Sequence, residues 1–320
     1  MTSPTVAIDA ARYLGVARTQ RVKDELAIVV TPKSFPPYLD DLAADWVSSV
    51  AVPAFRLLAQ RRGPVAGFAS IGTGTGLDAL GGIEVFAPQL VGITDVDEEI
   101  VASARANILA NVRDASALRL LAGTGDLLSP LAAAAPRFDV IYENLPNVPS
   151  NGSAALAGER ASSSFFGPRA ETVPESVQSA LLTLHYLALR QAHEFLQPGG
   201  VVLSMLGARV ALHHFLEMST AAGYQASFLS YGWKLQAEAL EILSGHAEWQ
   251  RRGLGPFRFY RLEPLQAAFA GLPPEQAAHQ ALEIEAGLLP HALDAEAALA
   301  LHRQGVTIGH TYAVLHSQRP

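Results

Sequence analysis

The residues of this sequence that are best suited to form a ligand-binding site are three glycines in one short stretch. Gly72, Gly74 and Gly76 alternate with threonines. Glycines at this spacing allow a tight turn and let backbone N–H groups approach a ligand closely. Asp95 lies at the end of the next expected strand, where a carboxylate can accept both hydroxyls of an adenosine ribose. Together, the loop and the acid predict a site for a nucleoside-containing ligand.

The same loop admits other interpretations. Gly74, Gly76 and Ala79 fit the G-x-G-x-x-A fingerprint of nicotinamide dinucleotide-binding domains. Asp95 is also placed to cap the helix that follows it, and Asp97 competes with it for the ribose role. A nucleoside site and a simple helix start therefore both remain open at this point.

Two further turns carry polar residues just after expected strands. Asp126, in a Gly-Asp-Leu turn that ends with Leu127, can accept a hydrogen bond from an adenine amine or simply shape the turn. The segment 142–149 follows another strand with the order Tyr-Glu-Asn-Leu-Pro-Asn-Val-Pro. Ligands of open α/β sheets bind at such carboxyl ends. Glu143 is placed there either to hold or deprotonate an amine or only to pair with an arginine.

The chain around these residues alternates strand and helix patterns, which favours a parallel sheet with helices on both faces. Apolar runs predict strands over 65–71, 90–95, 118–122, 138–142, 201–205, 226–230 and 311–316. Periodic spacing predicts helices over 77–86, 98–112, 177–196 and 210–222. The expected fold class is α/β and Rossmann-like, with a seven-stranded, mostly parallel sheet.

The remaining segments suggest how the chain is organised. We expect an N-terminal cap over 1–60, the α/β core over 61–231, a mostly helical substrate cap over 232–305, and the last strand of the core sheet over 306–320. Residues 151–176 are rich in Gly, Ser, Ala and Pro, a composition typical of a mobile loop. We expect this loop to act as a lid that orders on ligand binding.

Composition excludes several classes of protein. Apolar residues make up 49% of the chain and charged residues 17%, which excludes a disordered protein. The net charge of −7, without a basic cluster, argues against nucleic acid as a partner. There is no cysteine, and the ten histidines lack a metal-ligand spacing, so neither a disulfide nor a metal is expected. No apolar run is long enough to span a membrane, and no signal-peptide pattern begins the chain, so a cytoplasmic location is expected.

In their order along the chain, these motifs resemble the class I S-adenosylmethionine-dependent methyltransferases, over roughly residues 64–230. The glycine loop, the ribose acid, the Gly-Asp-Leu turn, the fourth-strand motif and a Leu-x-Pro-Gly-Gly turn at 196–200 occur in sequence. Many members have an acid where this chain has Ser70, so the ammonium group of the cofactor loses a charged partner here. The resemblance implies S-adenosylmethionine as the cofactor, bound by Ser70, Gly72, Thr73, Gly74, Gly76, Asp95, Val96, Asp126, Leu127 and Asn144.

The fourth-strand motif resembles a degraded Asn-Pro-Pro-Tyr, which is the motif of amino-group N-methyltransferases. In that family the Asn oxygen and the next carbonyl accept the N–H bonds of the target nitrogen, and the aromatic residue stacks on a flat target. Asn144 and Pro146 match this motif, whereas Leu145 and Asn147 depart from it, which argues against a flat base or amide as the acceptor. The candidate catalytic residues are Asn144, Glu143 and Tyr142, and the candidate substrate-binding residues are Leu145, Pro146, Asn147, Phe165, Phe166 and Trp233.

A fainter resemblance, carried by 203–209 and 257–260, is to the methyltransferase part of methionine S-methyltransferases, and it also implies a small acceptor. The expected function is methyl transfer to a nitrogen or sulfur of a small molecule, either amino-acid-like or a specialised metabolite. The alternatives are a protein-glutamine N-methyltransferase, an NAD(P)-dependent oxidoreductase, and a binding module that kept the fold without the chemistry. Neither a nucleic acid nor a membrane is expected as a partner.

Overall fold

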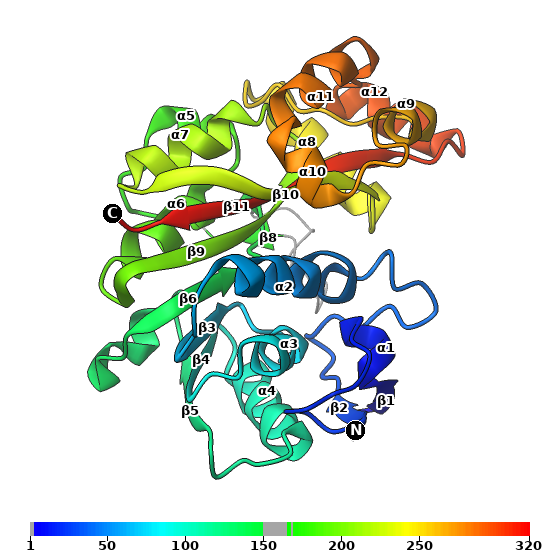
Figure 1. The fold of residues 1–320 in the computed structure, drawn as a ribbon. Helices are drawn as coiled ribbons and strands as arrows, with labels where there is room; N and C mark the ends of the chain where they lie inside the picture. The colour runs from blue at the N-terminus through cyan, green and yellow to red at the C-terminus, as the bar shows by residue number, and fades with distance from the viewer. Residues whose placement is uncertain (1–2, 150–164, 168) are drawn as a thin grey trace. The chain divides into compact units, whose positions relative to one another are not determined.

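The structure, a computed structural model, describes residues 3–149, 165–167 and 169–320. The chain divides into two compact units. The first unit comprises Met1–Leu145, Ala188–Leu203 and Gln318–Pro320, and the second unit comprises Pro146–Leu187 and Ser204–Ser317. A seven-stranded sheet has the order β10-β11-β9-β6-β3-β4-β5, with helices around it (Figure 1), which confirms the predicted α/β fold class.

Four neighbouring strands form the parallel core of the first unit. They are β3 (Gly67–Ile71), β4 (Leu90–Asp95), β5 (Arg119–Thr124) and β6 (Phe138–Glu143). β3 pairs with β4 and with β6, and β4 pairs with β5, all in parallel. Every residue of β3 is buried, as expected for a central strand that is covered on both faces. Apolar runs predicted these strands close to their observed bounds.

Helices cover this parallel core. They are α2 (Val52–Arg61), which follows the π-helical turn Val47–Ala51, α3 (Leu77–Phe86), α4 (Glu98–Asn111) and the short 3-10 helix Ser129–Ala134. α2 packs on α3 (Figure 1). The ring of Phe55 in α2 meets that of Phe68 in β3 edge-on, with 5.4 Å between the centroids. This aromatic contact fixes the helix layer on the sheet.

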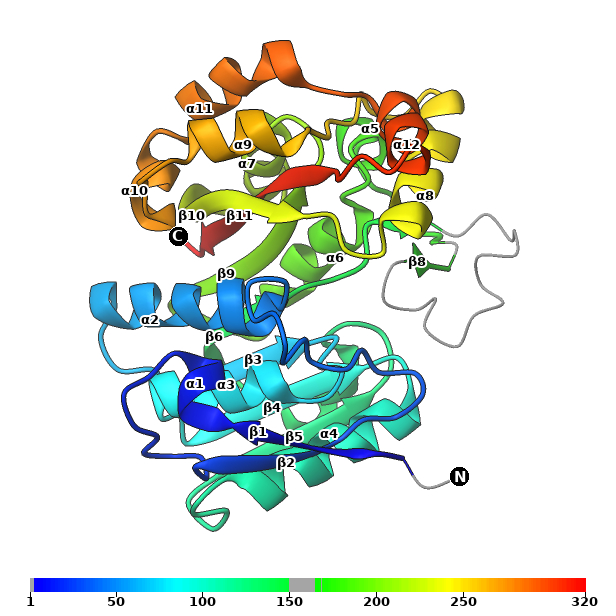
Figure 2. The same cartoon turned by 90° about the vertical axis from the view of Figure 1, so that its right-hand side faces the viewer.

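The N-terminal residues form a small sheet that sequence patterns did not reveal. Its elements are the antiparallel strands β1 (Thr5–Asp9) and β2 (Glu25–Val29) and the intervening helix α1 (Ala10–Leu14). α4 lies beside β2 (Figure 2), and two of its asparagines form hydrogen bonds with the backbone of that strand. The side-chain oxygens of Asn107 and Asn111 accept hydrogen bonds from the N–H groups of Val29 and Ala27, at 2.9 and 2.8 Å respectively. The side-chain NH2 groups of the two asparagines donate to the carbonyl oxygens of the same two residues. These amides attach the N-terminal sheet to α4.

The second unit contains the segments that follow the parallel core. Its elements are β7 (Val148–Pro149), β8 (Phe165–Phe166), α5 (Glu175–Ser179), α7 (His213–Ala221), β10 (Gln225–Leu235), α8 (Ala239–Arg251), α9 (Leu262–Ala268), α10 (Pro274–His279), α11 (Ala281–Leu288), the short η5 (Leu289–His291), α12 (Ala295–Arg303) and most of β11 (Gly309–Gln318). α6 (Thr183–Ala192) and β9 (Leu196–Ala208) are divided between the units. Helices α8 to α12 lie between β10 and β11 in sequence, where helices were predicted, and α8 packs against α12 (Figure 2).

Two predictions of local structure differ from the structure, and a third, the lid, is not tested by it. The single helix expected over 177–196 is two helices, α5 and α6, because the backbone turns at Leu181, which has a φ of 57°. The turn expected at 198–200 lies inside β9, which is longer than predicted. Residues 151–164 of the expected lid lie outside the described residues. Every helix in the described part of the chain is too short or too polar to cross a bilayer.

Candidate active site

Four loops start at the same edge of the parallel core. In the register of the sheet, Ile71 pairs with Thr94 on one side and with Glu143 on the other, and Asp95 pairs with Thr124. Neighbouring strands lie about 4.8 Å apart, so the residues that follow these ends are close neighbours. The edge carries the glycine loop, Asp95, Asp126 and Asn144. This is the edge at which open α/β sheets bind ligands.

The three glycines of the loop have the positive φ angles that favour glycine, 68° for Gly72, 52° for Gly74 and 82° for Gly76. Their surroundings differ. A Cβ atom on Gly72 would lie 3.3 Å from the Leu145 side chain, and one on Gly76 would lie 3.2 Å from the carbonyl oxygen of Ala104. A Cβ atom on Gly74 would meet nothing within 4 Å. Gly72 and Gly76 therefore serve close packing, whereas the backbone at Gly74 is open to a ligand.

Asp95 is joined to the open part of this loop. Its carboxylate accepts a hydrogen bond from the Gly74 N–H at 3.2 Å, and burial raises its pKa. The competing candidate, Asp97, caps α4 and pairs with Lys33 at 2.5 Å. Asp97 is thus occupied, which favours Asp95 for a ribose. Val96, which lies between the two acids, is 66% exposed and presents an apolar surface beside Asp95.

Asp126 lies in a turn that is tied to its neighbours. Gln191 donates from Nε2 to Asp126 Oδ2 at 3.3 Å. Leu127 is buried with a φ of 48°, and the Gly125 N–H donates to the Asp95 carbonyl at 2.9 Å. The half-buried Asp126 carboxylate is therefore held at the same edge as Asp95.

The three candidate catalytic residues have different surroundings. Tyr142 is buried, its ring packs edge-on against Phe55 at 5.1 Å, and burial raises the pKa of its phenol. Glu143 is fully buried, and its carboxylate accepts from the Leu145 N–H at 3.3 Å. Asn144 is exposed, and its side chain has no hydrogen-bond partner among the described residues. Of the three, Asn144 is the residue whose polar group is available to a ligand.

The predicted substrate-binding residues are divided between the units. Leu145 belongs to the first unit, where it is buried against the glycine loop. The others belong to the second unit: Pro146, Asn147, Phe165, Phe166 and Trp233. Asn147 donates from Nδ2 to the Leu181 carbonyl at 3.2 Å, and this nitrogen lies 3.1 Å from His185 Nε2. Asn147 is thus held by contacts within its own unit.

Sequence reasoning missed a buried acid beside the glycine loop. Asp78, in the first turn of α3, accepts hydrogen bonds from the hydroxyls of Ser70 and Thr73, the latter at 3.2 Å, and from the Ala79 N–H at 2.7 Å. Within the described part of the chain, no lysine or arginine pairs with it. Burial raises the pKa of Asp78 to about 6 despite these hydrogen bonds. A buried carboxylate thus lies beside Ser70, on the helix rather than on the strand; the available signal was an Asp inside an otherwise apolar helical turn.

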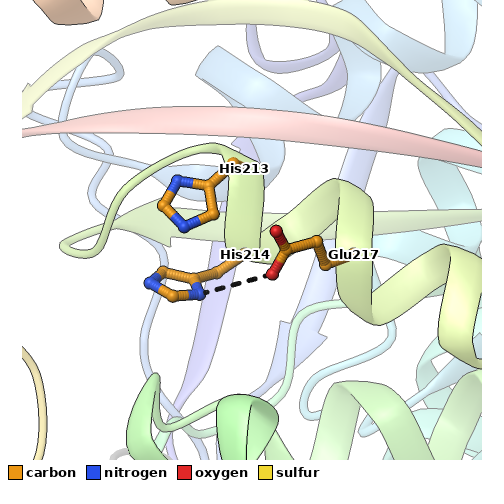
Figure 3. Close-up of side chains that lie close together, drawn as sticks. All are labelled: His213, His214 and Glu217. Atoms are coloured by element: carbon orange, nitrogen blue, oxygen red, sulfur yellow. Dashed lines mark ion pairs between the residues drawn. The ribbon is translucent and has the colours of Figure 1, made fainter.

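A second group of polar side chains lies in α7 of the second unit, where His213, His214 and Glu217 point toward one another (Figure 3). The two histidine rings lie only 4.1 Å apart at the first turn of the helix, a proximity that the spacing of the histidines in the sequence did not predict. The ligand atoms of all three residues lie within 4.8 Å of one another, a spacing that can suit a divalent metal. Burial lowers the pKa of His214, which favours the neutral form that metals bind.

Comparison with known proteins finds similarity in structure only. No family model and no curated protein matches the chain. A candidate methyltransferase from Bacillus halodurans is 13% identical, with 85% of this chain and 99% of that chain covered and a TM-score of 0.44. A candidate methyltransferase solved with SAH is 11% identical, with 68% and 48% covered and a TM-score of 0.42. A candidate SAM-dependent methyltransferase from Streptococcus mutans is also 11% identical, with 71% and 51% covered and a TM-score of 0.40.

The chain spans about half the length of the last two proteins, 48% and 51%. Similarity at this level assigns no activity to the chain, which must follow from its own residues.

Proposed function

We propose that this chain is an S-adenosylmethionine-dependent methyltransferase that methylates a nitrogen or sulfur of a small molecule. The observation that supports this best is the shared edge of the sheet. An open glycine, Gly74, a ribose-type acid, Asp95, and an uncommitted amide, Asn144, lie there at the ends of neighbouring strands. Methyl transfer needs these parts, because the cofactor must be held and the acceptor aligned with it.

The described residues fit the parts of the cofactor. The Asp95 carboxylate suits the ribose hydroxyls, the exposed Val96 suits a face of the adenine, and Asp126 suits the adenine amine. Asp78 adds a buried negative charge beside the loop, which suits the ammonium group in place of an acid at Ser70. Bound there, S-adenosylmethionine would supply an electrophilic methyl group on a positively charged sulfur.

Asn144 is the residue that would align the acceptor. Its amide oxygen can accept a hydrogen bond from an N–H or S–H group. The Leu145 carbonyl, in a residue that the following Pro146 biases to an extended conformation, can accept a second. In the transfer, a bond forms between the methyl carbon and the acceptor nitrogen or sulfur. The old carbon–sulfur bond breaks with its electron pair staying on sulfur, and any acceptor proton leaves to solvent. The buried Glu143 is better placed to fix the Leu145 backbone than to take that proton.

The order of the strands argues against the nicotinamide alternative. In a dinucleotide-binding domain the order is 3-2-1-4-5-6, so the fifth and sixth strands are neighbours. Here the last strand, β11, lies between β9 and β10. The G-x-G-x-x-A pattern of this chain therefore occurs in a sheet whose strand order differs from that of a dinucleotide-binding domain.

Titration calorimetry with S-adenosylhomocysteine tests the cofactor, with NAD and NADP as the competing ligands. We expect S-adenosylhomocysteine alone to bind. Asp95→Asn should weaken its affinity about ten- to hundred-fold, because charge-assisted hydrogen bonds to the ribose are lost. The matched control, Asp97→Asn, should leave the affinity unchanged, because Asp97 caps α4 instead. Equal effects of the two variants would contradict the ribose role, and binding of NAD instead would favour an oxidoreductase.

A labelling experiment tests the class of acceptor. The protein is incubated with methyl-labelled S-adenosylmethionine and a lysate of its source organism, and the label is separated by size. Label in small molecules supports the proposal, whereas label in protein would favour the glutamine alternative. With an acceptor in hand, Asn144→Ala should lower turnover about a hundred-fold, as loss of one aligned polar group does in other enzymes. The affinity for S-adenosylhomocysteine should stay that of the wild type; unchanged turnover would remove Asn144 from the mechanism.

A further inference from the structure

A group of basic and polar side chains meets inside the second unit, and we call it the Arg209 cluster. It consists of Arg209, which follows β9, Gln236, which follows β10, and His310 in β11. β11 lies between β9 and β10 in the sheet. His310 is buried and Arg209 is half-buried, so solvent still reaches part of the arginine. Strand order thus gathers groups that are distant in sequence.

Among the residues that the structure describes, the side-chain partners of the Arg209 guanidinium are neutral. Its Nε donates to Gln236 Oε1 at 2.9 Å, and its Nη2 lies 3.2 Å from His310 Nε2. His310 Nδ1 lies 2.8 Å from the Thr311 carbonyl oxygen, so this nitrogen carries the proton and Nε2 accepts from Arg209. Burial and the charge of Arg209 lower the pKa of His310, which keeps the imidazole neutral.

A second arginine of the same unit shows what the Arg209 cluster lacks. Arg258 pairs with Glu285 at 2.9 Å, and both side chains are partly buried. No carboxylate in the described part of the chain pairs with Arg209. Burial lowers the pKa of Arg209 to about 10, so it remains charged at neutral pH. A charge that is withdrawn from water without a counter-charge costs stability.

The free edge of the guanidinium is Nη1. No described residue accepts a hydrogen bond from it. It lies against Gly207, where an added Cβ atom would overlap Nη1, so the missing side chain makes room for the guanidinium. The charge of Lys234, which is only 6% exposed, also lowers the pKa of His310 and therefore lies near the cluster. The cluster presents an N–H edge in positive surroundings.

We propose that Arg209 binds the carboxylate of a small organic molecule. The carboxylate supplies the missing negative charge and accepts charge-assisted hydrogen bonds from Nη1. The guanidinium is planar and has one free N–H edge, which matches the planar carboxylate of an organic molecule, and inorganic phosphate is the competing anion in the test. This binding site does not depend on the proposed function.

The binding test uses the full chain without cofactor and the common L-amino acids, each beside its amide. A thermal-shift screen selects the ligand and titration calorimetry measures its affinity. We expect at least one free amino acid to bind, and its amide to bind about ten- to hundred-fold more weakly, because only the acid pairs with Arg209. R209M should bind the free amino acid more weakly than the wild type by the same factor. The affinity of R209K should lie between those of R209M and the wild type, since lysine keeps the charge but not the planar guanidinium. R258M is the matched control and should bind like the wild type.

Several results would overturn the site. They are the absence of binding by any free amino acid, equal affinity for acid and amide, and wild-type affinity in R209M. Tighter binding of inorganic phosphate than of any amino acid would overturn the carboxylate assignment. A thermal unfolding curve recorded for each variant shows that it is folded, so that loss of binding is not loss of structure.

The Arg209 site and the proposed function can fail separately. Binding of an amino acid without binding of S-adenosylhomocysteine would refute the proposed function and leave the Arg209 site standing. Binding of S-adenosylhomocysteine without binding of any amino acid would refute the Arg209 site alone.

Discussion

The two units bury charges of opposite sign. In the first unit the carboxylates of Asp45 and Asp78 are each only 5% exposed. Both are held by neutral donors, and neither pairs with a lysine or arginine in the described part of the chain. In the second unit Arg209 is held by Gln236 and His310, which are also neutral.

This difference indicates where ligands of each charge belong. A buried charge without a counter-charge lowers stability by several kcal/mol, about 3–5 kcal/mol where a former partner has been removed. Such groups are kept at sites that bind a ligand of opposite charge, where stability is given up for function. By this argument, we expect Asp78 to lie at a site that binds a cationic group and Arg209 at a site that binds an anionic group. The ammonium group of S-adenosylmethionine would supply the cation, and the carboxylate of a small organic molecule would supply the anion.

The largest expected effect is a pH dependence that comes from Asp78. Its pKa of about 6 in the folded chain exceeds the ordinary value of 3.8, so the folded state binds the proton more tightly than the unfolded state. The stabilisation is complete below about pH 4 and is lost as the pH rises through about 6, an effect on the order of 3 kcal/mol. Urea unfolding of the wild type and of Asp78→Asn from pH 4 to 8 measures it. Parallel profiles for the two proteins would contradict a strained acid in the first unit.

Moving the carboxylate from position 78 to position 70 by mutation tests whether Asp78 binds the cationic group of a ligand. Asp78→Asn should weaken binding of S-adenosylhomocysteine about ten- to hundred-fold at pH 7.5, because its ammonium group loses a buried carboxylate. The double variant Ser70→Asp, Asp78→Asn puts the acid on the strand end and should recover most of the affinity. Calorimetry measures both, and Asp97→Asn is again the control. If Asp78→Asn binds S-adenosylhomocysteine as tightly as the wild type does, Asp78 does not bind the cationic group of the ligand.

The sequence predicted the parts of the site that are local and missed the parts that are not. Asp95 and Asn144 follow strand ends, and an apolar run marks each strand, so their positions could be predicted. The role of Asp78 depends on a hydrogen bond to Ser70 that only the packing of α3 on β3 creates. The partners of Arg209 lie 27 and 101 positions away in sequence, on strands that become neighbours only in the folded sheet. No pattern in the sequence contains that information.

Removal of the unpaired positive charge should stabilise the second unit. Arg209→Met keeps an apolar stem of similar length and abolishes a charge that pairs with no acid among the described residues. We expect the free energy of unfolding to rise by about 1–2 kcal/mol, within the range seen when buried charges are replaced by apolar groups. Arg258→Met should instead destabilise, because it leaves Glu285 without its partner. Thermal unfolding without ligand measures both, and a large loss of stability in Arg209→Met would show that the arginine is structural.

No effect on ligand affinity is expected at a buried acid whose hydrogen bonds are already made within the chain. The Tyr13 hydroxyl donates to Asp45 at 2.9 Å, and the N–H groups of Ser48 and Tyr38 donate to the same carboxylate at 2.8 and 3.1 Å. Tyr13→Phe removes one of these three bonds, so we expect a loss of about 1–2 kcal/mol in the free energy of unfolding. The affinity for S-adenosylhomocysteine should not change. If it falls as far as in Asp78→Asn, Asp45 also serves the ligand, and the cationic site of the first unit includes both acids.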